Sequence, residues 1–451
     1  MKHTDIIQKL NLEQKCALLS GETVFTTRAL PGKGIPAITL SDGPNGVRKQ
    51  AGAADHLGLN PSVPATCFPT SSATACSWDE KLGEAVGEAL GEEAAAQEVA
   101  VLLGPGLNIQ RSPLCGRDFE YFSEDPILAG RMAAAYVRGI QKNGISACPK
   151  HFAVNSQELR RMASDSVLDE RTLRELYLTG FEIVVKEAKP KTIMTSYNLI
   201  NGTYANENAH LLQDILRKDW GFDGAVVTDW GGSNDHALGV KNGSTLEMPC
   251  PGGDSIRELM KAVQDGKISE ADVDARLDEM LELVLSTHAA VEKAPRTFDT
   301  AAHHKLARRA AAESIVLLRN EGGILPLKPN EKLAVIGDFA ETPSYQGAGS
   351  SAVNALQVDT LLDSIKADDS GITFVGYASG FERQGAADAE KLEEAVALAK
   401  KADTVLLCLG LDELRESEGL DRSDMKLAEN QQQLLAAVAA VNPNVVVLLS
   451  A

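Results

Sequence analysis

Short apolar runs rich in β-branched residues alternate with strong helix formers along most of this chain, and this alternation constrains the fold more than any other feature. In the first half, the β-like runs lie at residues 37–40, 99–103, 145–148, 192–196, 225–228 and 244–248. Helix formers fill residues 80–98, 128–142, 171–186 and 269–287. Strands that alternate with helices pair in parallel. At this length a (β/α)8-type, TIM-like barrel is the economical closure, so we predict one over residues 1–287.

A second alternation follows a stretch that loses periodicity around Lys293-Ala-Pro-Arg296. We interpret residues 288–309 as a linker and residues 310–451 as a smaller, doubly wound α/β sandwich domain. Its strands are expected at 333–337, 372–376, 404–410 and 445–449, and its clearest helices at 387–402 and 431–441. The sequence stops directly after an apolar run, at Ser450-Ala451. We therefore expect a second domain that is truncated and that continues, or is completed by another chain.

Composition and charge exclude several classes of function. The 451 residues are 44% hydrophobic and 24% charged, which are values of a globular protein, and contain no apolar run long enough for a bilayer. A formal charge of −19 opposes binding to nucleic acid or anionic lipid. Seven scattered cysteines without a Cys-x-x-Cys pair favour reduced thiols over a metal site. We expect a cytoplasmic protein without cofactor or metal, either monomeric or homo-oligomeric.

Polar or glycine-bearing sequence follows each β-like run of the first half directly. The clearest case is Asp229, which comes after the apolar run 225–227 and before Trp230 and two glycines. Because the carboxyl ends of parallel strands meet on one face of a barrel, we expect these strand-end residues to converge. A lone strand-end aspartate is more often a cap or a turn former, so a catalytic assignment of Asp229 depends on the residues that converge with it.

Several motifs, separated in the sequence, supply residues that could converge with Asp229. The segment 104–126, the run Lys150-His-Phe152, Arg161 and the sequence Thr228-Asp-Trp230 together resemble glycoside hydrolase family 3, the β-glucosidase group of retaining enzymes. The resemblance spans nearly the whole chain and implies a barrel followed by an α/β sandwich. It implies an exo-acting β-glycosidase, with β-glucosidase as the best single assignment. Such an enzyme releases terminal non-reducing β-D-glucosyl residues from small β-glycosides and oligosaccharides through a covalent glycosyl-enzyme intermediate.

The resemblance also implies roles for individual residues. Asp229 corresponds to the nucleophile, and Glu418, in the run Glu418-Gly-Leu-Asp-Arg422, corresponds to the general acid/base, with Glu416 left open as an alternative. A Gly-Ser-rich loop at 347–352 is expected to reach the sugar through Ser350 or Ser351. The positions implied for substrate binding are Asp42, Arg48, Arg117, Lys150, His151, Arg161, Met194, Tyr197, Trp230 and Ser351.

The chemistry requires these residue types independently of the family. Retaining hydrolysis uses one carboxylate as nucleophile and a second carboxyl group, roughly 5–5.5 Å away, first as acid and then as base. Glu418 must hold a proton near neutral pH, so we expect a crowded or apolar setting that raises its pKa. Asp229 must stay ionised, so we expect nearby cations to lower its pKa.

Other interpretations remain open at this point. Lys150 could form a Schiff base in an aldolase-like barrel, although its neighbouring histidine and the two carboxylates disfavour that. β-Xylosidase and α-arabinofuranosidase activities use the same family site. A truncated second domain could misplace Glu418 and leave a sugar-binding protein without turnover. The glycines near residue 347 lack the spacing of a dinucleotide or phosphate loop, and the run Lys150-His-Phe-Ala-Val-Asn155 disfavours a histidine acid/base.

Overall fold

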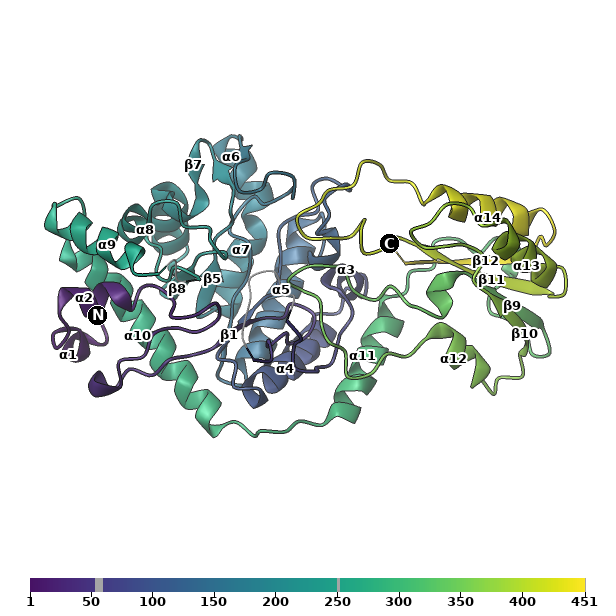
Figure 1. Cartoon of the computed structure of the whole chain (residues 1–451), viewed down its shortest axis with the longest axis horizontal. Helices are drawn as coiled ribbons and strands as arrows, with labels where there is room; N and C mark the ends of the chain where they lie inside the picture. The colour runs from purple at the N-terminus through teal and green to yellow at the C-terminus, as the bar shows by residue number, and fades with distance from the viewer. Residues whose placement is uncertain (53–59, 250–251, 451) are drawn as a thin grey trace. The chain divides into compact units, whose positions relative to one another are not determined.

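A computed structural model describes every residue except 53–59, 250, 251 and 451, and in it the chain forms two compact units (Figure 1). The first unit contains residues 1–315, to which the later segments Gly349–Leu356 and Glu418–Asp421 also belong. The second unit contains residues 316–348, 357–417 and 422–451. One of these two later segments carries Glu418. The α/β class and the organisation into two parts agree with the prediction.

The strands of the first unit are short and mostly parallel. β1 (Leu40–Asp42), β2 (Val101–Leu103) and β3 (Ser146–Ala147) form one parallel sheet, and β5 (Thr192–Met194) pairs in parallel with β8 (Ala225–Val227). Three further strands, β4 (Asp165–Ser166), β6 (Leu199–Ile200) and β7 (Thr203–Tyr204), form a separate small sheet. Four predicted runs thus contain the paired strands β2, β3, β5 and β8, and the predicted run 37–40 ends at the first residue of β1. The predicted single barrel sheet is instead divided into separate pieces.

Isolated bridges join these pieces. Phe152 pairs with Thr195 in parallel, and Val227 pairs with Leu246 in parallel. The predicted run 244–248 therefore contributes single bridges instead of a full strand. Glu247 continues the series by pairing with Ser20, and two antiparallel bridges, Gly21–Thr27 and Thr26–Thr39, lead back to the residues before β1.

Helices cover the strands of the first unit (Figure 1). Its α-helices are α1 (Thr4–Ile7), α2 (Leu12–Ala17), α3 (Ser71–Ala75), α4 (Glu80–Ala96), α5 (Pro126–Gln141), α6 (Glu170–Thr172), α7 (Thr179–Ile183), α8 (His236–Asn242), α9 (Asp254–Gln264), α10 (Glu270–Lys293) and α11 (Thr300–Ser314). Residues 173–177, 184–188 and 210–219 are π-helical. The helix formers of the sequence therefore form helices, with a π-helical irregularity in the predicted helix 171–186.

The segment predicted as a linker is largely helical, which corrects the sequence interpretation. α10 continues to Lys293, and α11 fills residues 300–314 behind an Asp299 cap whose side chain accepts a hydrogen bond from the amide of Ala302. Only residues 294–299 lie between the two helices, and α11 clusters with the first unit. The sequence pattern does not reveal α11, because its Ala-rich and His-rich sequence carries little hydrophobic periodicity.

The second unit contains a parallel sheet of the predicted kind. Its strands are β9 (Lys332–Ile336), β10 (Thr373–Ala378), β11 (Thr404–Gly410) and β12 (Val445–Ser450), in the order β10-β9-β11-β12. The order reverses beside the first strand, as in doubly wound sheets. α12 (Leu361–Lys366), α13 (Ala389–Ala399) and α14 (Glu429–Ala439) connect these strands, and α13 packs beside α14 (Figure 1).

Close helix packing supports the first unit where α4 crosses α5. A side chain at Gly139 would place its Cβ 2.2 Å from the carbonyl oxygen of Glu84, and one at Gly87 would meet the carbonyl oxygen of Tyr136 at 2.4 Å. Only glycine permits two helix backbones to approach so closely, so these glycines allow α4 and α5 to pack directly against each other.

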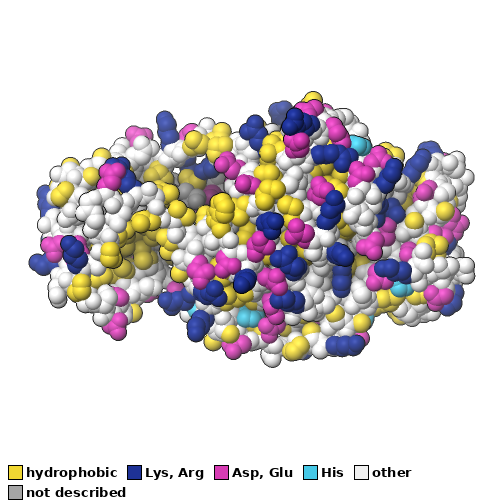
Figure 2. All heavy atoms as spheres, turned by 180° about the vertical axis from the view of Figure 1, so that it is seen from behind, with side chains coloured by type: hydrophobic (Ala, Val, Ile, Leu, Met, Phe, Trp, Pro, Cys, Tyr) yellow, Lys and Arg dark blue, Asp and Glu magenta, His cyan; other side chains and the backbone are white. Residues whose placement is uncertain are grey.

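The surface and the cysteines bear on the classes of function. Acidic and basic side chains are interspersed on the face seen in Figure 2. Within the described residues, no helix is both long and apolar enough to span a membrane. The six described cysteines form no disulfide, and four of them are buried. Cys250 lies outside the described residues.

Candidate active site

Asp229 lies two residues after Val227, the last residue of β8, and is buried. Its Oδ1 accepts a hydrogen bond from the amide of Trp230 at 2.8 Å. Its Oδ2 is buried and has no hydrogen-bond partner among the described residues, and the Nε2 of His151 lies 3.6 Å from it. A buried carboxylate oxygen without a partner is costly unless something else binds there. This oxygen is therefore the one available for chemistry.

Contacts with Tyr121 and Asn108 orient His151. Its Nδ1 lies 3.2 Å from the hydroxyl of Tyr121, and Asn108 holds its backbone by accepting from the amide and donating to the carbonyl. Burial lowers the pKa of His151 well below its usual value, and the neighbouring cations Arg117 and Lys150 lower it further. The imidazole is therefore neutral, so it can bind a hydroxyl group but adds no charge beside Asp229.

A buried ion network surrounds Arg117 and Lys150. The Nη2 of Arg117 lies 2.7 Å from Oε2 of Glu120, and the Nζ of Lys150 lies 3.0 Å from Oε1 of the same residue. Burial lowers the pKa of Lys150, but the charges of Glu120, Asp42 and Glu418 together outweigh burial, and the net pKa is raised. A lysine that forms a Schiff base needs a depressed pKa, so this environment argues against the aldolase alternative.

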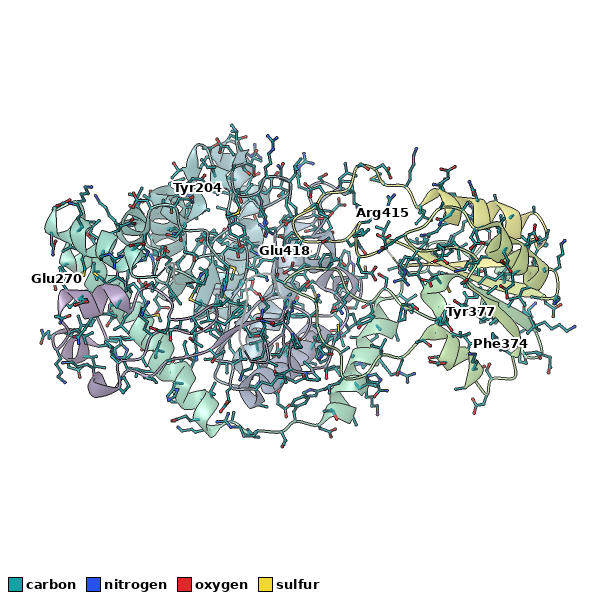
Figure 3. All side chains as sticks on the ribbon, viewed as in Figure 1. Tyr204, Glu270, Phe374, Tyr377, Arg415 and Glu418 are labelled. Carbon is teal, nitrogen blue, oxygen red and sulfur yellow. The ribbon has the colours of Figure 1, made fainter. Side chains whose placement is uncertain are left out.

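Glu418, labelled in Figure 3, lies on the long loop between β11 and α14 and belongs to the first unit. Its Oε1 lies 2.9 Å from Nη1 of Arg161 and 3.6 Å from Nη1 of Arg117. Its Oε2 accepts the amide of Ser350 at 2.7 Å. Gly349 allows this approach, because a Cβ there would lie 2.4 Å from the Cβ of Glu418.

The pKa shifts of the two carboxylates are opposite to those expected from the sequence. Burial raises the pKa of Glu418, but Arg117, Arg161 and the amide of Ser350 outweigh burial and hold that pKa well below its usual value. Burial raises the pKa of Asp229, and the lowering effect of the arginines does not overcome it. The expectation failed because both arginines lie closer to Glu418 than sequence spacing could indicate. The charge of Glu418 also contributes to the raised pKa of Asp229, so the two carboxylates interact electrostatically.

Glu416 differs from Glu418 in its place and its environment. It belongs to the second unit, and burial raises its pKa to about 7 although Arg422 opposes the shift. That pKa would suit a general acid, whereas the contacts with Arg117 and Arg161 favour Glu418. Geometry takes precedence in assigning an acid, because a proton is transferred only within hydrogen-bond reach.

Asp42, Tyr197 and Trp230 complete the cluster. Burial raises the pKa of Asp42 to about 6, with Lys150 opposing the shift and the charge of Glu418 adding to it. Tyr197 donates its hydroxyl to the carbonyl of Trp230 at 2.8 Å, and the guanidinium of Arg161 lies 4.8 Å from the centre of the Tyr197 ring. The Trp230 indole donates to the carbonyl of Val24 at 2.7 Å. Trp230 is therefore held in place by polar contacts and is not merely packed.

Three of the predicted binding residues have structural contacts of their own. Arg48 donates to the carbonyl of Gly349 at 3.1 Å and so supports the Gly-Ser-rich loop. Met194 is 2% exposed and packs in the core at the end of β5. Ser351 is buried, and the serine whose amide contacts Glu418 is the preceding Ser350.

Sequence reasoning assigned no role to two buried glutamates, Glu120 and Glu158. Glu120 pairs with Arg117 and Lys150, and Glu158 pairs with Arg161 at 2.6 Å and accepts the amide of Gly419 at 2.8 Å. Each glutamate stands three positions from the arginine that it binds. That spacing was available as a signal, since residues three apart share a face of a helical turn.

Comparison with known proteins shows two domain matches and close relatives. Residues 53–283 match the glycosyl hydrolase family 3 N terminal domain, and residues 315–451 match the glycosyl hydrolase family 3 C-terminal domain. The chain is 45% identical, over 98% of its length, to a thermostable beta-glucosidase B of Acetivibrio thermocellus. It is also 45% identical, over 98% of its length, to an exo-alpha-(1->6)-L-arabinopyranosidase of Bifidobacterium longum.

A solved structure has the same fold. The crystal structure of a GH3 beta-glucosidase of Bifidobacterium adolescentis superposes with a TM-score of 0.92 at 43% identity and covers 98% of this chain. The chain spans 59% of the length of each of the two relatives and 63% of that crystallised chain.

Proposed function

Because the chain belongs to glycosyl hydrolase family 3, we propose that it is a retaining, exo-acting β-glucosidase whose nucleophile is Asp229 and whose general acid/base is Glu418. Its substrates would be small β-glycosides and oligosaccharides with a terminal non-reducing β-D-glucosyl residue. The single observation that carries the proposal is the buried, unpartnered Oδ2 of Asp229, in a site that it shares with Glu418.

In the first step, Oδ2 of Asp229 attacks the anomeric carbon while the bond from that carbon to the glycosidic oxygen breaks. The leaving oxygen takes the proton of Glu418. The product of this step is an ester between the sugar and Asp229. Glu418 is ionised in the arrangement described here, so it must take up a proton from solvent before this step.

In the second step, the ionised Glu418 accepts a proton from water, and the water oxygen attacks the anomeric carbon. The ester bond to Asp229 breaks and the sugar leaves with its original configuration. A low pKa of Glu418 suits this step, since the carboxylate is then ready to act as a base. The contacts with Arg117 and Arg161 therefore match the hydrolysis of the intermediate better than its formation.

The remaining residues would bind the sugar. The Asp42 carboxylate can accept hydrogen bonds from two hydroxyl groups, and Lys150 and Arg117 can donate to others. Neutral His151, 3.6 Å from the reactive oxygen of Asp229, can donate to a hydroxyl beside the anomeric carbon. Glu120 holds Arg117 and Lys150 at fixed positions, which reduces the entropy lost when the sugar binds.

We also propose a closed barrel for the first unit. The parallel sheets and isolated bridges of the first unit would belong to one closed barrel, in which the bridges at Phe152–Thr195, Val227–Leu246 and Ser20–Glu247 join the separate pieces. The antiparallel bridges at Thr26–Thr39 and Gly21–Thr27 would complete the circuit. Asp229 would then lie at the carboxyl-terminal face, where barrel enzymes place their active sites.

Replacement of the nucleophile tests the proposal. Asp229→Ala should abolish hydrolysis of an aryl β-glucoside, because no group remains to form the ester. Azide should restore part of the activity and yield a glucosyl azide of inverted configuration, detectable by proton NMR. An azide product of retained configuration, or full activity without azide, would contradict the assignment of Asp229.

A second candidate is an exo-α-L-arabinopyranosidase. The Bifidobacterium longum relative with that activity is as similar to this chain, at 45% identity, as the beta-glucosidase of Acetivibrio thermocellus. Nitrophenyl β-glucoside, β-xyloside, α-arabinofuranoside and α-arabinopyranoside, compared by kcat/KM, distinguish these activities. Binding of glucose or an iminosugar without turnover of any of them would favour a sugar-binding protein instead.

A further inference from the structure

The segment Glu418–Asp421 belongs to the first unit, although Ser417 and Arg422 on either side belong to the second. These four residues therefore belong to a different unit from their neighbours in the sequence. Glu418 is the first of them, and its position depends on what holds the segment. The contacts of Glu418 with Arg161 and Ser350 cannot fix the loop alone, because a general acid/base has to exchange partners during the reaction.

Asp421, the last residue of the segment, accepts hydrogen bonds through both of its carboxylate oxygens. Its Oδ1 accepts the amide of Gly116 at 3.1 Å and the amide of Glu158 at 3.0 Å. Its Oδ2 accepts the same Glu158 amide at 3.1 Å and the amide of Leu159 at 2.8 Å. One carboxylate therefore binds three backbone amides from two loops of the first unit. Hydrogen bonds from amides to an ionised acceptor are among the stronger ones in proteins.

Both loops that Asp421 binds carry partners of Glu418. Gly116 directly precedes Arg117, and Glu158 lies three residues before Arg161. The side chain of Glu158 closes the arrangement, because its Oε2 accepts the amide of Gly419 at 2.8 Å and also contacts Arg161. The contacts of Asp421 therefore set the distance between Glu418 and both arginines without touching the reacting atoms.

We propose that Asp421 is a positioning residue, whose carboxylate latches the acid/base loop to the two arginine-bearing loops and so places Glu418 for proton transfer. The inference rests on the proposed function, because it takes Glu418 as the acid/base. It differs from that proposal in one respect: the latch itself can be observed in the protein whether or not the protein turns over a glycoside.

Asp421→Asn tests the latch with little change of volume. The new amide group must face backbone amides, so part of the acceptor set is lost. The matched control is Asp424→Asn, because Asp424 accepts an amide hydrogen bond from Lys426 on the same loop but lies in the second unit. Asp421→Glu, which keeps the carboxylate, is the conservative variant for rescue.

Hydrogen exchange provides the readout that does not depend on catalysis. Peptides containing the amides of Gly116, Glu158 and Leu159 should exchange roughly 10- to 100-fold faster in Asp421→Asn than in the wild type, because a hydrogen bond to a charged acceptor is lost. They should be unchanged in Asp424→Asn. Unchanged exchange in Asp421→Asn would overturn the latch, even if the wild type proved inactive and the proposed function failed.

Leaving-group dependence provides the catalytic readout. On methyl β-glucoside, which needs an acid, Asp421→Asn should lose on the order of 10- to 100-fold in kcat/KM, because a misplacement of about 1 Å costs up to that much. On 2,4-dinitrophenyl β-glucoside, which needs none, the loss should stay below about 3-fold. Asp421→Glu should recover part of the loss. Equal losses on both substrates would mean that Asp421 supports the fold only, and would overturn the positioning role.

Discussion

Gly349 lies directly against Glu418, and replacing it offers a sharp test of how closely the acid/base is positioned. A Cβ at residue 349 would lie 2.4 Å from the Cβ of Glu418 and 2.7 Å from its Oε2. Carbon atoms in ordinary contact lie about 3.5–4.0 Å apart, so Glu418 would have to move by more than about 1 Å. The φ angle of Gly349 is +119°, which adds a backbone strain of about 1–3 kcal/mol for alanine.

Gly349→Ala should therefore impair acid catalysis far more than it impairs stability. We expect kcat/KM on methyl β-glucoside to fall by about 100-fold, from a displacement of about 1 Å. We expect a fall of less than about 5-fold on 2,4-dinitrophenyl β-glucoside, whose leaving group needs no proton. Tm, measured by calorimetry, should decrease by a few degrees, in line with strain of about 1–3 kcal/mol.

Gly419→Ala is the matched control for strain. Gly419 has a φ of +85°, and a Cβ there would meet no atom within 4 Å. Its alanine variant bears a similar conformational cost without a collision with Glu418. If the two variants lost the same activity on both substrates, backbone strain and not displacement of Glu418 would explain the result, and the reasoning would be refuted.

Three further predictions concern protonation and packing. Arg161 lowers the pKa of both Glu418 and Asp229, so Arg161→Met should raise both pKa values and move both limbs of the pH profile of kcat/KM to higher pH; an unchanged profile would contradict this. Asp42 has a pKa of about 6, and its protonated form accepts fewer hydrogen bonds, so inhibition by glucose should weaken as the pH falls through about 6. That pH dependence should disappear in Asp42→Asn, and its persistence would assign it to another group. Gly139→Ala would place a Cβ 2.2 Å from a carbonyl oxygen of α4, so the free energy of unfolding in urea should fall by about 1–3 kcal/mol; an unchanged midpoint would show that the two helices can separate at no cost.

Local pattern predicted much of the secondary structure. The strands β2 and β8 are apolar at every residue, which is the pattern of strands buried on both faces. The strand predicted at 244–248 is replaced by single bridges. The pairing of these bridges depends on residues far away in the sequence, such as Ser20, which a local pattern does not reveal. The prediction of a linker at 288–309 missed α11, because the sequence of this capped helix has little hydrophobic periodicity.

For the candidate site too, local sequence indicated the residues but not their environment. Motifs indicated Asp229, Glu418, Arg117, Lys150 and His151, since each stands in a recognisable short sequence. The pKa directions expected for Glu418 and Asp229 were wrong, because a pKa depends on which charges lie within a few ångströms.

By itself the sequence determined the α/β class, the division into two parts, the buried strands and the residue types that the chemistry needs. These follow from hydrophobic period and from short motifs, which are local properties of the chain. Only the tertiary structure decided that Glu418–Asp421 joins the first unit, that two arginines hold Glu418 ionised, and that Asp421 binds three amides from two loops. The physical reason is that hydrogen bonds and Coulomb interactions act over a few ångströms, whereas these partners are separated by up to 305 positions in the sequence.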